Sequence, residues 1–297
     1  MDSIELLREI DPAAKVAPTA EIGPYTVIGP NVTIGPKTII GRRVTIQGHT
    51  VIGSGNHIGD GCVLGVLPQD LKFRGGETRL VIGHSNRIGR NVTMHCGTES
   101  GGWVTRLGSE NSLHEGCHVA HDTFIADRCV IGRSTQLAGH TSVETGAVIG
   151  ALSGLHHFVT VGRYACVGSY TPVRRDVPPF TIYGGEEGSQ AQPSIRGLNE
   201  KGIHAAGLKG DEEAELRRAL TDLFENETAM QSTVEQLENL GVEGEAARLC
   251  KFLQKSLEGK FGRIREAYRG KVPPEAVEHI PAELLEKIRA TMSIVES

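Results

Sequence analysis

An aliphatic residue recurs at every sixth position over most of the first two thirds of the chain. The repeat runs as IGPYTV, IGPNVT, IGPKTI and IGRRVT from Ile22, and it ends as VGRYAC and VGSYTP at Pro172. Side chains return to one face every 3.6 residues in an α-helix and every 2 in a β-strand, so neither structure explains a period of six. Hexapeptide repeats are typical of a parallel β-helix, in which each repeat forms one side of a coil and the aliphatic side chains stack inside.

The repeat also predicts which residues lie above one another. Three hexapeptides make one coil of 18 residues, so residues 18 positions apart are expected to stack at about 4.8 Å. The motif HVAHD places two imidazoles and a carboxylate where the repeat otherwise has small or apolar side chains. Gly139 and His157 follow His121 of this motif at the coil spacing, and His140 and His156 flank them. We therefore expect histidines that are distant in the sequence to meet on one edge of the coils.

Two polar, glycine-containing segments break the period and are expected to leave the β-helix as loops. The first is VLPQDLKFRGGETRLV over residues 66–81, and the second is HCGTESGGWVTR over residues 95–106. Loops that project from a rigid repeat scaffold often carry function. Gln69, Asp70 and Lys72 are the polar candidates in the first loop, although ordinary solvated side chains would look the same.

Prolines after residue 172 stop the repeat and suggest a division of the chain into three parts. We expect a β-helix domain over residues 1–183, a connector over 184–210 that contacts a ligand, and a helical domain over 211–297. Apolar residues at helical spacing predict three helices in that domain, over residues 211–240, 243–268 and 273–293. The second of these helices is the most basic and could receive an acidic protein partner.

Composition narrows the function classes. The 297-residue chain has a formal net charge of −5, which argues against a nucleic-acid partner. Its six cysteines follow no metal-ligand spacing and are expected to be reduced side chains in the core, as in a cytoplasmic protein. No apolar stretch is long enough for a signal peptide or a membrane span, so we expect a soluble protein without membrane insertion.

The HVAHD motif offers acid–base chemistry. Imidazole titrates near neutral pH, so His121 could take a proton from a hydroxyl nucleophile. Asp122 could fix the tautomer of His121, or it could instead be a partner across a subunit boundary. Gly139 has no side chain, so its backbone N–H could approach a developing oxyanion.

Zinc binding is an alternative for the same residues. His118, His121 and His140 could supply three nitrogen ligands. The spacings of four and three between His114, His118 and His121 suit a helix better than a β-helix, and no cysteine or carboxylate set completes a shell. We therefore expect no metal at this site.

Several segments in order resemble one enzyme family. They are PQDLKF, GETRLVIG, GGWVTRLGSEN, HVAHD, LAGH, LHHF and RDVPP, and together they cover roughly residues 11–210. With them the chain resembles the acyl-carrier-protein-dependent UDP-N-acetylglucosamine O-acyltransferases of lipid A biosynthesis. The resemblance implies a homotrimer of left-handed β-helices with C-terminal helices, whereas the cytoplasmic location is expected from the composition. The resemblance also implies that no metal or organic cofactor is used, because the acyl group arrives on the phosphopantetheine of acyl carrier protein.

The resemblance implies roles for individual residues. His121 is the general base for the sugar 3-hydroxyl, Asp122 supports it, and the Gly139 N–H binds the oxyanion. The residues implied to bind substrate are His118, His140 and His156 at the sugar nucleotide, and Gln69, Asp70 and Lys72 from the projecting loop. The chain departs from the family pattern at His157 beside the thioester, Ser169 at the acyl chain and Lys201 near the nucleotide, where the family commonly has glutamine, glycine and arginine. Arg196 could supply the missing cation, because a guanidinium can bind phosphate with two hydrogen bonds.

Three rival functions remain open at this point. An N-acyltransferase would use a 3-amino analogue of the sugar nucleotide and form an amide. A metal-dependent hydratase on the same scaffold would bind zinc. A non-catalytic trimer would still bind the carrier protein but would not transfer the acyl group.

Overall fold

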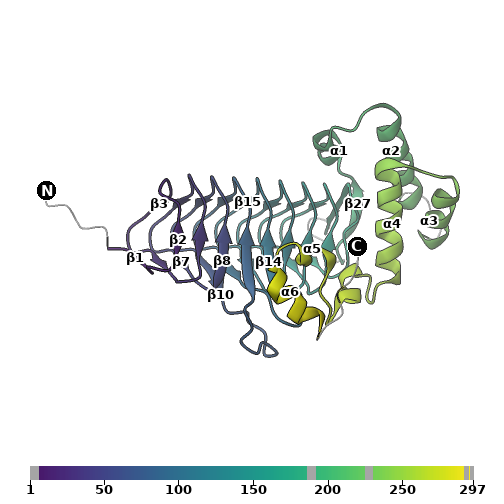
Figure 1. The fold of residues 1–297 in the computed structure, drawn as a ribbon. Helices are drawn as coiled ribbons and strands as arrows, with labels where there is room; N and C mark the ends of the chain where they lie inside the picture. Colours follow the sequence, from purple (N-terminus) through teal and green to yellow (C-terminus); the bar gives the residue numbers. More distant parts are fainter. Residues whose placement is uncertain (1–6, 186–191, 225–229, 291–293, 295–297) are drawn as a thin grey trace.

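The structure, a computed structural model, describes residues 7–185, 192–224, 230–290 and 294. Most of the chain winds into a long parallel β-helix, and a group of helices lies at its C-terminal end (Figure 1). Short strands form three sheets along the sides of the coil, and within the described residues each uninterrupted coil contributes one strand to each sheet. No helix among the described residues is long and apolar enough to cross a membrane.

The strands are distributed over the sheets in sequence order. The first sheet contains β1 (Glu9–Ile10), β4 (Val27–Ile28), β7 (Thr45–Ile46), β10 (Val63–Val66), β13 (Thr93–His95), β16 (His118–Val119), β19 (Gln136–Leu137), β22 (Gly154–Leu155) and β25 (Pro172–Val173). The second contains β2 (Lys15–Val16), β5 (Thr33–Ile34), β8 (His49–Ile52), β11 (Arg79–Ile82), β14 (Val104–Leu107), β17 (Phe124–Ile125), β20 (Ser142–Val143) and β23 (Thr160–Val161). The third contains β3 (Glu21–Ile22), β6 (Ile39–Ile40), β9 (His57–Ile58), β12 (Arg87–Ile88), β15 (Ser112–Leu113), β18 (Val130–Ile131), β21 (Val148–Ile149), β24 (Cys166–Val167), β26 (Thr181–Gly184) and β27 (Ser194–Leu198).

Uninterrupted coils pair in parallel with a shift of 18 residues. His118 lies opposite Gln136, and Gln136 lies opposite Gly154. The second residue of these strands is buried while the first is at least partly accessible. The buried aliphatic residues form one continuous core, as the hexapeptide period predicts. Burial of each such side chain contributes about 1.5–3 kcal/mol, so the regular stack is the main source of stability in this part of the chain.

The cysteines largely follow the expectation of reduced core side chains. All six are free, and five are buried. Burial raises the pKa of the Cys62 thiol to about 11, so this group stays protonated near neutral pH. Cys166 differs, because it is the first residue of β24 and is only partly buried.

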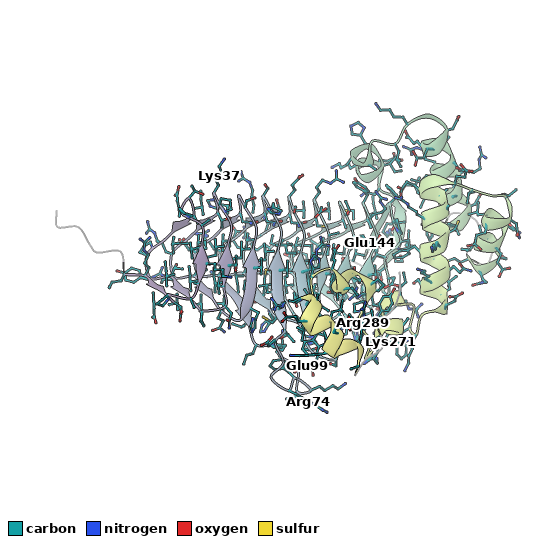
Figure 2. All side chains as sticks on the ribbon, in the orientation of Figure 1. Lys37, Arg74, Glu99, Glu144, Lys271 and Arg289 are labelled. Atoms are coloured by element: carbon teal, nitrogen blue, oxygen red, sulfur yellow. The ribbon has the colours of Figure 1, made fainter. Side chains whose placement is uncertain are left out.

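Both predicted interruptions leave the coil at the corner between the first and second sheets. The first loop lies between the end of β10 and the start of β11, so the ends of the predicted 66–81 segment are strand residues. The second loop lies between β13 and β14. The two loops contact each other, since the Glu99 carboxylate accepts the N–H of Gly76 at 2.6 Å and that of Arg74 at 3.2 Å. Figure 2 shows Arg74 and Glu99 together on this projection.

The proposed connector is more ordered than a plain loop. Its strand β27 pairs antiparallel with β26 and extends the third sheet, with Thr181 opposite Leu198. The short helix α1 (Glu200–Ala206) follows. Residues 186–191, which hold most of its glycine-rich and acidic part, lie outside the described residues.

The helical segments are shorter than the apolar pattern suggests. The observed helices are α2 (Gly210–Phe224), α3 (Met230–Asn239), α4 (Gly244–Glu258), the 3-10 helix η1 (Ile264–Tyr268), α5 (Pro274–Val277) and α6 (Ala282–Arg289). Two of the three predicted helices are interrupted for local reasons. Phe261 and Gly262 have positive φ angles of 62° and 65°, which end the helical path before η1. Pro281 immediately precedes α6, where the fixed φ of proline suits a helix start.

The last segments pack against the side of the β-helix instead of capping its end. Helices α2, α3 and α4 form one core with Tyr164 and Phe180 from the final coils. In contrast, α5 and α6 turn back along the second sheet beside β14 (Figure 1). There Ala276 and Ile288 join a separate cluster with Val104 and Phe124.

Candidate active site

The His121 and Asp122 side chains form a buried pair at the corner between β16 and β17. The His121 Nδ1 atom lies 2.8 Å from Asp122 Oδ2. A carboxylate can only accept here, so Nδ1 carries the proton and Nε2 is the unprotonated nitrogen of the neutral ring. Asp122 is fully buried, and the whole His121 residue is 5% exposed. The pair is therefore formed within one chain, and Asp122 does not need a subunit boundary to reach a partner.

The second loop holds the Asp122 carboxylate in place. Thr98 donates its backbone N–H to Asp122 Oδ1 at 2.9 Å and its hydroxyl to Oδ2 at 2.6 Å. The Asp122 N–H in turn donates to the Thr105 hydroxyl at 2.8 Å. A side chain at Gly101 would collide with the carboxylate, which explains a glycine at that position. Thr98 was not among the predicted site residues, and the only sequence signal for it is its place in an interruption of the repeat.

His140 lies against the same pair. Its ring packs edge-to-face on His121 with centroids 5.0 Å apart, and its Nδ1 is 3.9 Å from Asp122 Oδ2. Its other face stacks on Phe158 with centroids 4.4 Å apart. Burial lowers the pKa of His140 to about 4, so the ring is neutral near pH 7. Because its side chain is only 15% exposed, little of His140 is left to contact a ligand.

The C-terminal segment supports His140 from behind. Arg265 donates its Nε–H to the His140 carbonyl oxygen at 2.7 Å. The Arg269 guanidinium lies 4.2 Å from the centre of the Phe158 ring, so it covers the residue that stacks on His140. Cation–π contacts of this kind contribute about 0.5–2 kcal/mol. Residues more than a hundred positions away in the sequence therefore fix the surroundings of the pair.

A second histidine pair lies next to the first loop. The Gln69 Nε2 atom is 2.7 Å from His118 Nε2, and His118 Nδ1 is 2.7 Å from the Thr93 hydroxyl. His95 packs edge-to-face on His118 with centroids 5.2 Å apart. Burial lowers the pKa of His118, with smaller contributions from His95 and His121. His95 was not among the predicted site residues, although it opens the second interruption.

A cavity of about 320 Å³ runs from this corner along the outer face of the first sheet. His121, Gly139 and His157 line one edge, and Gln136 and Gly154 belong to the strands beneath. A Cβ atom built on Gly154 meets nothing within 4 Å, so the missing side chain keeps this part of the cavity open. Gly154 and Gln136 were not among the predicted site residues.

Gly139 is required by the packing of His121. A Cβ atom at this position would lie 2.5–3.1 Å from the imidazole ring, which is too close for any other residue. Among the hydrogen bonds of the described residues, none uses the Gly139 N–H. That group is therefore available to an oxygen atom in the cavity, next to His121.

His157 and His156 follow one coil further on and are both exposed. Their rings pack edge-to-face with centroids 5.6 Å apart. Burial lowers the pKa of His157, which lines the cavity. The His157 carbonyl oxygen accepts a hydrogen bond from Arg263 at 3.2 Å.

Besides His140 and His156, five predicted substrate-binding residues do not line this cavity in a single chain. Asp70 and Lys72 are on the first loop, where Asp70 Oδ1 accepts the Lys72 N–H at 2.9 Å. Ser169 is exposed at the corner between the third and first sheets, not at the corner of His121. Arg196 on β27 and Lys201 on α1 are exposed beyond the last coils.

The candidate metal ligands fit a proton-transfer site better than a metal shell. His121, Asp122 and His140 offer ligand atoms within 4.8 Å of one another. However, the Asp122 oxygens already accept hydrogen bonds from Thr98 N–H, Thr98 O–H and His121 N–H. A cation would have to displace these donors, which fix the carboxylate from both sides.

Comparison with known proteins connects this geometry to one group of enzymes. A family model described as UDP-N-acetylglucosamine O-acyltransferase, domain 2, matches residues 176–261. The acyl-(acyl-carrier-protein)–UDP-N-acetylglucosamine O-acyltransferase of Nautilia profundicola is 37% identical over 204 residues, 69% of this chain and 77% of that protein. The Synechocystis enzyme of the same name is 40% identical over 213 residues, 71% of this chain and 75% of that protein.

Solved structures of similar proteins share the fold. LpxA from Acinetobacter baumannii is 32% identical with a TM-score of 0.75, covering 84% of this chain and 95% of that one. LpxA from Bacteroides fragilis, a UDP-N-acetylglucosamine acyltransferase, is 32% identical with a TM-score of 0.78, covering 84% and 96%. These structures are left-handed β-helices, and the predicted fold class is thereby confirmed.

Proposed function

The chain belongs to the acyl-carrier-protein-dependent UDP-N-acetylglucosamine O-acyltransferases, and from this premise we propose that His121 is the general base of the reaction. The enzyme transfers a 3-hydroxyacyl group from acyl carrier protein to the 3-hydroxyl of UDP-N-acetylglucosamine, the first step of lipid A biosynthesis. One observation carries the assignment to His121. Its Nδ1–H is bound to Asp122, and the ring lines the cavity beside Gly139.

The proposed reaction passes one proton through His121. The Nε2 atom takes the proton of the sugar 3-hydroxyl while its oxygen attacks the thioester carbonyl carbon. The Gly139 N–H donates to the oxyanion of the tetrahedral intermediate, and Asp122 stabilises the imidazolium. Collapse of the intermediate breaks the C–S bond, and the imidazolium returns its proton to the departing sulfur. An ester and the free thiol of the carrier result, so all atoms and charges balance.

No metal ion or organic cofactor enters this proposal, because the carrier's phosphopantetheine delivers the acyl group. The lowered pKa of His118 favours its neutral ring, which can exchange hydrogen bonds with the hydroxyls of a sugar nucleotide. His118 reaches the cavity directly, together with Gln69. His140 instead packs against the His121 ring and holds it in place. His156 and His157 lie further along the same edge, and His157 lines the cavity next to the proposed path of the thioester.

We also propose that the active unit is a homotrimer in the cytoplasm. Ser169, Arg196 and Lys201 lie away from the cavity of their own chain, so another subunit must present them if they contact the same substrate. A cleft between subunits would also place Asp70 and Lys72 of the exposed loop near the nucleotide. In the same assembly, the exposed Lys260, which follows α4 in the basic segment predicted as the second helix, would face an acidic carrier protein.

A transfer assay followed by mass spectrometry tests the reaction. The purified protein is offered a series of 3-hydroxyacyl carrier proteins with either UDP-N-acetylglucosamine or its 3-amino analogue. We expect an ester on the first acceptor. A product on the 3-amino analogue alone would assign N-acylation. Carrier binding without any product would instead assign a non-catalytic trimer.

Replacing Gly154 with leucine is expected to shorten the acyl chain that the enzyme prefers. Gly154 leaves open space in the cavity, and each methylene excluded from an apolar site costs about 0.8 kcal/mol. Loss of two methylenes from the cavity would lower kcat/KM for the longest donor about tenfold. Competition between long and short donors measures the effect. Val27→Leu on the outer face of the same sheet is the control, and an unchanged preference in Gly154→Leu would contradict binding of the acyl chain here.

A further inference from the structure

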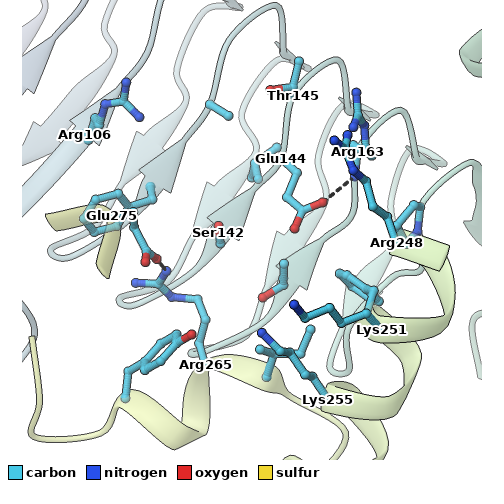
Figure 3. Close-up of a pocket in the computed structure, with 18 residues that line it drawn as sticks. Arg106, Ser142, Glu144, Thr145, Arg163, Arg248, Lys251, Lys255, Arg265 and Glu275 are labelled. Carbon is cyan, nitrogen blue, oxygen red and sulfur yellow. Dashed lines mark hydrogen bonds and ion pairs between the residues drawn. The ribbon is translucent and has the colours of Figure 1, made fainter. Parts of the chain in front are cut away.

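A second and larger cavity lies on the other side of the His121 corner. It has a volume of about 560 Å³ and opens between the second sheet and the segments α4, η1 and α5 (Figure 3). Phe124, Ser142 and Thr160 form its floor, one residue from each of three successive coils. The small side chains of Ser142 and Thr160 leave a hollow that the helical segments wall in. We call this cavity the flank pocket.

Positive charge dominates the flank pocket. Its cationic lining residues are Arg106, Arg163, Arg248, Lys251, Lys255 and Arg265, against the two carboxylates of Glu144 and Glu275. This excess is local, because the chain as a whole has a net charge of −5. Figure 3 shows Lys251 and Lys255 pointing from α4 into the hollow.

Half of these cations have no carboxylate partner. Arg163 and Arg248 both pair with Glu245, at 2.8 and 3.0 Å, and Arg265 pairs with Glu275. In the part of the chain that the structure describes, no ion pair engages the other three, which are Arg106, Lys251 and Lys255. Like charges gathered in a concave site repel one another, so a bound anion would stabilise this arrangement.

One buried group on the floor adds to this demand for an acceptor. The Thr160 hydroxyl has no hydrogen-bond partner although the residue is only 4% exposed. Buried polar groups normally have a partner, so this hydroxyl has an unused hydrogen bond to donate. Burial raises the pKa of Glu144, whose carboxylate accepts the Arg163 N–H at 2.9 Å. Glu144 therefore opposes an incoming anion less than an exposed carboxylate would.

We propose that the flank pocket binds a phosphorylated small molecule. A phosphate group carries about −1.5 to −2 charges and three acceptor oxygens, so it can engage separate lysines and a hydroxyl at once. A lone carboxylate has two oxygens and one charge, which match this set of donors less well. Phe124 of the floor, together with Phe252 and Tyr268, also lines the pocket, and these rings would accommodate an apolar part of the molecule.

The flank pocket is separate from the cavity that contains His121, and this proposal does not depend on the transfer reaction. One residue connects the two sites. Arg265 lines the flank pocket and also donates to the His140 carbonyl oxygen. An anion that attracts the Arg265 guanidinium would thus act on the residue that packs against His121 and Asp122.

Isothermal titration calorimetry of the full-length protein tests the proposal. The probes are inorganic pyrophosphate and phenyl phosphate, each in buffers adjusted to the same ionic strength with sodium chloride. The test variant is Lys251→Gln/Lys255→Gln, and the charge-matched control is Lys37→Gln/Lys271→Gln, whose lysines are exposed outside the pocket (Figure 2). Loss of one or more charge-assisted hydrogen bonds should weaken binding at least about tenfold in the test variant only.

The outcomes separate the alternatives. Tighter binding of phenyl phosphate assigns an ester with an apolar group, whereas equal or tighter binding of pyrophosphate assigns a diphosphate. Either result supports the pocket if the control binds like the unmodified protein. Failure of the unmodified protein to bind either probe, or the same affinity in both double variants, overturns the proposal. The exposed positions of Lys251 and Lys255 make misfolding of the test variant a minor concern, and a thermal melt checks it.

Discussion

Replacing His121 with alanine is expected to lower the rate of acyl transfer by at least about 10²–10⁴-fold while the chain remains folded. General bases contribute factors of this size, because without one the hydroxyl must attack while still protonated. The fold should survive because Asp122 keeps both hydrogen bonds from Thr98 when the imidazole is removed. His121 also lies at a corner of the coil, outside the aliphatic stack.

The measurement is kcat for the variant with saturating donor and acceptor, together with a thermal melt. His57→Ala provides a matched control, because His57 is exposed on the outer face of the third sheet, away from the cavity. A rate within a few-fold of the unmodified enzyme would eliminate His121 as the base. A melt far below that of the control would instead mean that the loss of activity reflects unfolding.

The repetitive part of the fold could be predicted because its period is fixed by packing. Each hexapeptide repeats the same requirement for one inward aliphatic side chain, so the 18-residue stack of His121, Gly139 and His157 follows from counting. The clash between a Cβ at position 139 and the imidazole gives a physical reason for the glycine in that column. The assignment of roles to these residues stays a prediction until turnover is measured.

The contacts of the two loops could not be predicted in the same way. Nothing in the hexapeptide pattern specifies that Thr98 reaches Asp122, or that His95 packs on His118. Both contacts depend on the path of segments that leave the repeat. The predicted boundary between the β-helix domain and the helical domain stays a proposal. Helices α5 and α6 belong to the helical part in sequence, but they pack on the second sheet of the β-helix.

In the C-terminal helical part, apolar spacing did not predict where the helices end. Apolar spacing predicted continuous helices, but the left-handed backbone at Phe261 and Gly262 redirects the chain and brings Arg265 and Arg269 beside His140 and Phe158. Such a turn depends on tertiary contacts that a local pattern does not contain. The support of the candidate site by η1 is therefore visible only in three dimensions.

Replacing Asp122 with asparagine is expected to lower kcat by about 10²–10⁴-fold with little change in KM. The Asp122 carboxylate receives only donors, from Thr98 and His121. The asparagine amide adds a donor of its own. In one orientation the amide NH₂ points at a donor of Thr98, so two donors face each other. In the other orientation the NH₂ points at His121 Nδ1, which must then accept, and the ring proton moves to Nε2. A ring protonated at Nε2 cannot accept the sugar proton, and a wrong tautomer of this kind costs about 10⁴-fold in related triads.

The backbone should tolerate this change. Asp122 has a φ angle of 57°, in the left-handed region that asparagine adopts more readily than most residues. Asp127→Asn is the control, because Asp127 also lies at a corner of the same coil and accepts a backbone N–H, from Ser109 at 2.7 Å. The decisive measurement is kcat of the His121→Ala/Asp122→Asn double variant. If the two residues act as one unit, the double variant should be about as slow as His121→Ala alone. A further loss of the size seen in Asp122→Asn would mean that Asp122 acts independently of His121.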